Sequence, residues 1–200
     1  MNLRNFGRAA VVAAVSLTLA ACGINSVPTA EEEANAKWAD VQSAYQRRAD
    51  LIPNLVSTAR AAAESEEAIL SEVTNARSRA MGITINTNDL SDPEEFARFQ
   101  EGQNQLTQAL GQFRTVVENY PALQSNERFA DLMVSLEGTE NRIDRARTEY
   151  NEAVRAYNTT IRTFPDTIGA NIIHGAEPME AFTAQPGSES APVADFGLED

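Results

Sequence analysis

A heptad-like stripe of mostly apolar residues runs through most of this 200-residue chain. It recurs at steps of three and four in three runs, residues 38–80, 96–120 and 129–164. Such spacing keeps one face of a helix turned toward neighbouring helices, and the alternation typical of strands is absent. The sequence therefore predicts an all-α fold: an antiparallel up-down bundle of three to four long helices with coiled-coil-like packing.

Start and stop signals limit these helices. Residues 29–32 and 92–95 each have the spacing of a capping box. The pairs Tyr120–Pro121 and Phe164–Pro165 end the second and third helices. Pro53 lies inside the first run. Because proline lacks a backbone donor and clashes one turn back, we expect the first helix to kink or divide there.

Residues 1–21 have the pattern of a signal peptide. Arg4 and Arg8 precede an apolar core of 13 residues, which is too short to cross a hydrocarbon layer that needs roughly 20. The lone cysteine, Cys22, follows in a context that resembles a bacterial lipobox. We therefore expect a lipoprotein anchored in the membrane through acylated Cys22 and a short tether at residues 22–30. The alternative is a true membrane helix with an incidental cysteine.

Charge limits the partners of the protein. The formal net charge is −13, and removing the two arginines of the signal peptide makes it −15. A surface this acidic repels phosphate backbones, so we expect no nucleic-acid partner. Acylation would leave no free thiol, which excludes disulfides and cysteine catalysis.

The bundle is predicted to span residues 31–168, followed by an acidic tail at 169–200. From residue 177 onward there are six acidic residues and no basic one, so we expect this tail to be disordered. Phe182 and Phe196 are candidate docking points within it.

Five polar residues fall on or beside the apolar stripe: Arg48, Glu66, Gln103, Glu140 and Arg147. Charged residues are rarely buried unless they are paired, so we predict an interior polar layer that fixes helix register. The alternative is a carboxylate metal site inside the bundle. Such a site needs Glu-x-x-His pairs, and the one histidine, His174, lies outside the bundle and follows no glutamate at that spacing. We therefore predict no metal, no cofactor and no catalytic residue.

A Tyr–Asn pair occurs twice at an interval of seven residues, as Tyr150–Asn151 and Tyr157–Asn158. On a helix the two pairs face the same way. Two interpretations stay open: the tyrosines pack and the asparagines bond to neighbouring helices or water, or the four residues form a face that binds a partner.

Two segments carry a family resemblance. Residues 45–56 read YQRRADLIPNLV, and residues 139–165 begin TENRI and continue through Tyr150–Asn151 and Tyr157–Asn158 to Phe164–Pro165. These motifs resemble the LemA family over roughly residues 38–165. The resemblance implies an all-helical, membrane-tethered bacterial protein whose domain lies outside the cytoplasm and whose biochemical activity is not established. The family generally has an N-terminal membrane helix, which the lipobox replaces here.

The function expected from these features is a non-enzymatic interaction or scaffold protein of the cell envelope, with unidentified envelope proteins as partners. Because Gly23 rather than aspartate follows Cys22, the periplasmic side of the outer membrane is favoured. The heptad-like spacing also suits a homo-oligomer. Two alternatives stay open: a metal-binding or enzymatic bundle that uses Glu66 and Glu140, and a peptide-sensing domain in which one helix opens to admit a foreign helix.

Overall fold

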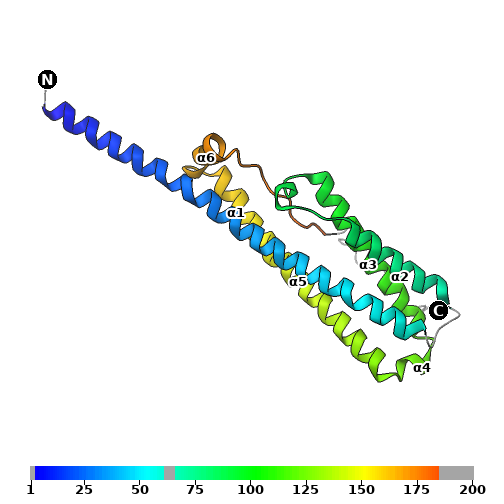
Figure 1. Ribbon diagram of the computed structural model, residues 1–200. Coiled ribbons are helices and arrows are strands. Elements are labelled where there is room, and N and C mark those ends of the chain that lie inside the picture. Colours follow the sequence, from blue (N-terminus) through cyan, green and yellow to red (C-terminus); the bar gives the residue numbers. More distant parts are fainter. Residues whose placement is uncertain (1–2, 61–65, 185–200) are drawn as a thin grey trace, which may run out of the picture.

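The computed structural model describes residues 3–60 and 66–184, with side chains from residue 25 onward. The described chain is all-α, as predicted. Its elements in order are α1 (Leu3–Arg60), α2 (Glu67–Gly82), η2 (Thr87–Asp89), α3 (Pro93–Val117), α4 (Pro121–Gln124), α5 (Glu127–Arg162), α6 (Asp166–Gly169) and η3 (Ala170–His174). The long helices α1, α2, α3 and α5 lie side by side in an elongated, antiparallel bundle, and the first part of α1 projects beyond its end (Figure 1).

The apolar core has two compartments. One is formed by α1, α5, the start of α3 and the C-terminal segment, and it is centred on Trp38, Phe96 and Tyr150. The other is formed by the end of α1, α2, the rest of α3 and the start of α5, and it contains Leu106 and Phe113. The heptad-like stripe predicted that one face of each helix is buried against its neighbours, and the division into two compartments comes from the structure.

The capping prediction holds at one helix and is wrong at the other. Asp92 caps α3 by accepting the backbone N–H groups of Glu94 and Glu95, with Pro93 in the first turn. Residues 29–32 instead lie inside α1, where the Thr29 hydroxyl donates to the Asn25 carbonyl at 2.7 Å. Helix α1 continues here because Val27 is fully buried in the core. The tether expected at residues 22–30 is therefore helical.

Helix α1 also runs unbroken through Pro53, so the division expected there is wrong. In the described residues, the first run is carried by two helices, α1 up to Arg60 and α2 from Glu67. Proline at position 53 cannot donate to the carbonyl of Ala49, four residues earlier. In the structure Arg77 of α2 supplies the missing donor, with Nε 2.7 Å from that carbonyl oxygen. Packing against α2 thus replaces the hydrogen bond that proline removes.

The C-terminal region differs from the disordered tail expected from residue 169. Residues 169–174 are helical, and residues 176–184 run back along the bundle as an extended segment, here called the strap (Figure 1). Met179 and Phe182 of the strap are buried in the core. The rest of the predicted tail, including Phe196, lies outside the described residues.

Over the part of the chain that the structure describes, no helix combines the length and apolar character needed to cross a membrane.

Candidate functional site

The interior polar layer is centred on Arg48, whose side chain is only 1% exposed. Its Nη1 atom donates to Glu140 Oε1 at 3.0 Å and to Thr107 Oγ1 at 2.8 Å. Its Nη2 atom donates to the side-chain oxygen of Gln103 at 2.8 Å and to the Gln103 carbonyl at 3.3 Å. The guanidinium also lies over the Tyr45 ring, 5.2 Å from its centroid. Burial of this charge is tolerated because nearly every donor is satisfied.

This layer joins the four long helices and lies where the two core compartments meet. Arg48 comes from α1, Gln103 from α3 and Glu140 from α5, while Gln103 Nε2 reaches the Ala80 carbonyl of α2 at 3.4 Å. Sequence analysis missed Thr107, although it lies one turn after Gln103 and so shares its helix face. The layer therefore ties the helices together at one level.

Two residues predicted for the layer lie elsewhere. Glu66 precedes α2 and accepts a hydrogen bond from the Tyr120 hydroxyl, because the chain divides between α1 and α2. The guanidinium of Arg147 lies over the Phe182 ring of the strap, 4.6 Å from its centroid. The helical pattern contained no signal for this contact, since the strap has no helical periodicity.

The arrangement of the carboxylates gives the metal-site alternative no support. That alternative needs Glu66 and Glu140 as neighbours, yet Glu66 bonds to Tyr120 and Glu140 bonds to Arg48. Within the described residues, no three histidine, cysteine, aspartate or glutamate side chains lie close enough to share a metal ion.

Of the two interpretations of the Tyr–Asn pairs, the structure agrees with packing tyrosines and bonded asparagines: both tyrosines are buried, and the asparagines bond to the chain's own strap. Asn151 Nδ2 donates to the Phe182 carbonyl while its Oδ1 accepts the Phe182 N–H, both at 2.9 Å. Asn158 forms the same pair of hydrogen bonds with Met179, also at 2.9 Å. The Tyr150 hydroxyl donates to the Glu180 carbonyl at 2.9 Å. Each asparagine thus pairs with the strap backbone much as a neighbouring strand would.

The spacing of these pairs has a geometric cause. Seven residues of α-helix rise by about 10.5 Å, at about 1.5 Å each. Three residues of extended chain cover about 10 Å, at about 3.3 Å each. Asn151 and Asn158 are seven apart on α5, and their partners Phe182 and Met179 are three apart on the strap. A heptad-spaced pair of asparagines can therefore hold an extended segment antiparallel to its helix.

Aromatic contacts hold the strap from the side. Phe182 stacks against Trp38 with a centroid distance of 6.1 Å and meets Tyr150 edge-on at 5.7 Å. Burial raises the pKa of Tyr150 above its usual value, and the carboxylate of Glu180 raises it further. Burial also raises the pKa of Tyr157. Both phenols therefore stay protonated at neutral pH, and Tyr150 acts as a hydrogen-bond donor.

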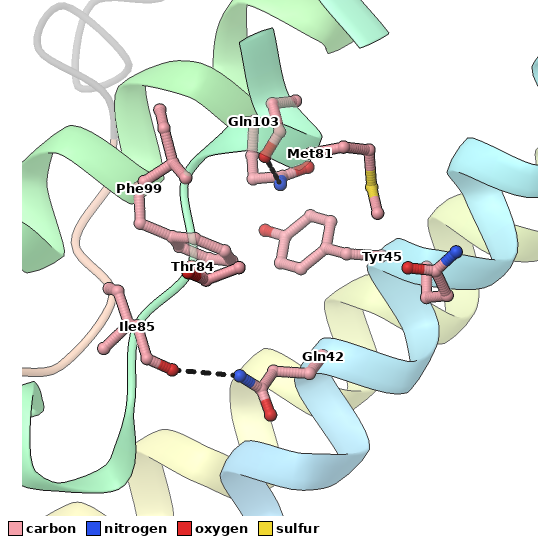
Figure 2. Close-up of a pocket in the computed structure, with 10 residues that line it drawn as sticks. Gln42, Tyr45, Met81, Thr84, Ile85, Phe99 and Gln103 are labelled. Atoms are coloured by element: carbon pink, nitrogen blue, oxygen red, sulfur yellow. Dashed lines mark hydrogen bonds between the residues drawn. The ribbon is translucent and has the colours of Figure 1, made fainter. Parts of the chain in front are cut away.

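A shallow pocket opens beside the polar layer, between α1, α3 and the segment that follows α2 (Figure 2). Tyr45 points into it and Gln103 lies at its edge, while Gln42 Nε2 donates across it to the Ile85 carbonyl at 3.1 Å. Its lining residues, all in the described part of the chain, include no carboxylate and no histidine.

Cys22, the predicted lipidation site, lies within α1, and its side chain is outside those that the structure describes.

Comparison with known proteins agrees with the helical fold. The sequence model of the LemA family matches residues 37–196. The chain is also 28% identical over 185 residues to magnetosome protein MamQ 2 of Paramagnetospirillum magneticum, which covers 83% of this chain and 66% of that protein. It is 28% identical over 183 residues to magnetosome protein MamQ of Magnetospirillum gryphiswaldense, with the same shares. The chain thus spans 66% of the length of these curated relatives. From the family match over most of its length, the chain belongs to the LemA family.

Proposed function

We propose that this chain is a lipoprotein of the bacterial cell envelope, anchored through acylated Cys22, whose helical bundle serves as a scaffold for other envelope proteins and catalyses no reaction. The observation that carries the proposal is that the polar groups inside the bundle form hydrogen bonds with one another. Arg48, Gln103 and Glu140 bond to one another across the bundle, so they hold helices in place instead of facing a substrate.

The shape of α1 supports the anchor. The helix is continuous from Leu3 to Arg60, so an acyl group on Cys22 would be joined to the bundle without a flexible link. Among the side chains that the structure describes, from residue 25 onward, the first fully buried one is Val27, five residues after Cys22 and about 7.5 Å along the helix. The bundle would therefore stand close to the lipid surface, with its domain outside the cytoplasm.

The matched relatives support a structural or interaction role. Both are magnetosome proteins, which associates them with a cellular structure. The heptad-like surface also leaves a homo-oligomer as one form that such a scaffold could take.

The anchor is tested by expressing the full chain in a bacterium that processes lipoproteins. We expect mass spectrometry to find a mature N-terminus at Cys22 that carries acyl chains, in the membrane fraction. Cys22→Ser should lose the acyl mass, whereas the neighbouring change Gly23→Ala should keep it. An unmodified thiol on a freely secreted product would refute the anchor.

The non-enzymatic role is tested on the same purified chain by metal analysis and by crosslinking in intact cells. We expect metal far below one ion per chain, and crosslinked envelope proteins that disappear in Cys22→Ser. Stoichiometric iron, manganese or zinc that is lost in Glu140→Gln would favour the metal-binding alternative instead.

The strap favours a second candidate, a peptide-binding face. Asn151 and Asn158 already hold an extended backbone with paired hydrogen bonds, so a partner segment of similar sequence could replace the strap. The peptide would be extended, in contrast to the foreign helix expected from sequence.

The probe for this candidate is a fluorescent synthetic peptide of residues 176–184. We expect it to bind the full chain with Met179→Ala and Phe182→Ala, which weaken the chain's own strap, and to bind the unaltered chain at least ten-fold less. Adding Asn151→Asp should abolish binding. Equal binding to all variants, or none, would exclude a peptide site here.

A further inference from the structure

One end of the bundle exposes an apolar stripe formed by Phe164, Ile168, Ile172 and Ile173. Of the five most exposed large apolar side chains in the described residues, four lie in this stretch, and Ile172 is 78% exposed. Phe164 lies in the turn before α6, Ile168 lies in α6, and Ile172 and Ile173 lie in η3, so four exposed apolar side chains fall close together along the chain. Contiguous exposed apolar surface of this kind marks a site of contact.

The stripe lies where α1 enters the bundle. Helix α6 packs against α1 there (Figure 1). Ser26 Oγ donates to Asp166 Oδ1, which ties α6 to α1 only four residues after Cys22. An anchor at Cys22 would therefore hold this end of the bundle against the membrane.

The charge near the stripe suits a lipid surface. The whole chain contains 29 acidic residues, but residues 163–176 contain one, Asp166, and it is hydrogen-bonded to Ser26. Arg162 and His174, both exposed, flank the stripe. Residues 163–176 themselves therefore add little to the repulsion that an acidic domain meets at a headgroup layer.

We propose that Phe164, Ile168, Ile172 and Ile173 insert into the membrane interface beside acylated Cys22 and orient the bundle on it. This inference rests on the proposed anchor. An acyl anchor alone leaves the domain free to tilt, whereas apolar side chains that enter the boundary between headgroups and acyl chains, about 5–10 Å deep, add a second contact.

Size favours lipid over a second copy of the chain. The four side chains are 51–78% exposed, so they present at most about 650 Å² even if each were as large as an aromatic side chain of about 250 Å². A stable protein complex buries about 800 Å² on each partner. The stripe is therefore too small for a dimer interface by itself.

The test places an environment-sensitive fluorophore on the thiol introduced by Ile172→Cys in the full, processed chain. Acylation blocks Cys22, so mass spectrometry should find one label per chain. The protein is reconstituted into phosphatidylcholine vesicles with and without bromine near the headgroup end of the acyl chains. We expect a blue-shifted emission and loss of on the order of half of it in brominated vesicles, given the shallow depth of such insertion.

The matched control is Val134→Cys, because Val134 is 69% exposed and lies near the other end of α5. Its label should be neither shifted nor quenched. Equal behaviour of the two labels would overturn the inference, and so would a blue shift at Ile172→Cys that appears without vesicles and resists bromine, since that result indicates self-association.

Failure of this inference is distinguishable from failure of the anchor. If Cys22 is acylated but the label at Ile172→Cys is not quenched, the contact of the stripe with the membrane is refuted and the anchor is retained. Conversely, two labels per chain would show that the Cys22 thiol is free, which refutes the anchor. Quenching at Ile172→Cys that persists after Cys22→Ser would still support the contact of the stripe with the membrane.

Discussion

At the scale of the residue, Arg48 shows how a charge is kept inside an apolar bundle. Four hydrogen bonds to Glu140, Thr107 and Gln103 replace the water that its two terminal nitrogens lose. Its Nε atom has no partner among the described residues. Removing the Arg48 side chain should cost folding free energy, because each of its partners would lose a hydrogen bond.

Arg48→Ala should lower the free energy of unfolding by about 3–5 kcal/mol, because it empties the space of a large, fully buried side chain and leaves the buried Gln103 oxygen without its donor. Glu140→Ala should cost less, about 1–3 kcal/mol, because the Glu140 side chain is 40% exposed and water can replace it. Urea unfolding measures both values. The exposed Arg98→Ala serves as control, with a change of about 0.5 kcal/mol or less. An equal loss for Arg48→Ala and Glu140→Ala would contradict this ranking.

Stability should fall at alkaline pH because buried tyrosines resist ionisation. The pKa of Tyr150 is raised in the folded state from its ordinary value of 10.0. Below pH 10 the Tyr150 hydroxyl keeps its proton in both the folded and the unfolded state, so its contribution to the free energy of unfolding is constant. Above pH 10 the unfolded chain loses the proton first, so stability decreases as pH rises, by at most about 1.4 kcal/mol per pH unit for one group.

Urea unfolding on either side of pH 10 tests this prediction. Tyr150→Phe should start from lower stability, because the hydrogen bond to the Glu180 carbonyl is lost, and should then fall less steeply with pH. A slope unchanged by Tyr150→Phe would assign the alkaline transition to other groups.

At the scale of the element, α1 and α2 depend on each other at Pro53. A proline inside a helix leaves a carbonyl without its donor, and Arg77 of α2 donates to that carbonyl of Ala49. The continuity of α1 is thus a property of the helix pair.

Arg77→Ala should lower the free energy of unfolding by about 1–3 kcal/mol, since the Ala49 carbonyl loses its partner. The double variant Arg77→Ala with Pro53→Ala should recover part of this loss, because alanine at position 53 donates to Ala49 itself. Thermal or urea unfolding of the four combinations measures the coupling. Additive effects of the two substitutions would show that Arg77 acts elsewhere.

The strap depends on asparagine, whose side chain both donates and accepts. Asn151→Asp and Asn158→Asp keep the shape but place a carboxylate against a carbonyl oxygen of the strap. Each should weaken the strap by about 1–3 kcal/mol. Hydrogen exchange at the amides of Met179 and Phe182 should accelerate roughly ten- to hundred-fold as a result.

Asn141→Asp is the matched control for the strap variants, since Asn141 is exposed on the same helix. It should leave exchange of the strap amides unchanged. Protection that survives Asn151→Asp and Asn158→Asp together would show that Phe182 and Met179 are held by apolar burial alone.

At the scale of the whole molecule, the bundle is an acidic rod with two apolar compartments and one polar layer where they meet. The layer fixes the level at which α1, α3 and α5 align, while the compartments supply burial on either side. Long-range repulsion between negative charges acts against this compact state, because the chain has 29 acidic residues and only 16 basic ones.

Added salt should therefore stabilise the protein. Exposed ion pairs such as Arg79–Glu72 contribute about 0–1 kcal/mol and weaken with salt, whereas screening of the net charge of −13 relieves repulsion across the whole surface. We expect the melting temperature to rise as sodium chloride increases from about 0.01 M to 0.15 M, where the Debye length falls from about 30 to 8 Å. A falling melting temperature would show that the ion pairs dominate.

Sequence reasoning was most successful where information is local and repeated. The helical stripe, the Asp92 cap and the turn at Pro121 depend on residues within a few positions of one another, so they were predicted correctly. Three of five members of the polar layer were also placed together, because their positions on the stripe already turn them inward. Glu66 was misplaced because the break after Arg60 has no proline or glycine to signal it.

The sequence alone determined the all-α class and the inward face of each helix, because periodicity acts through near neighbours. It also turned Arg48, Gln103 and Glu140 inward, but the tertiary structure decided that these three share a layer with Thr107 and that Glu66 and Arg147 do not. Only the tertiary structure decided that α1 passes through Pro53 and that the strap covers the Tyr–Asn face. Both depend on donors from segments distant in sequence, Arg77 for the first and Asn151 with Asn158 for the second. No local sequence pattern predicts such partners, since their hydrogen bonds exist only after the helices have packed.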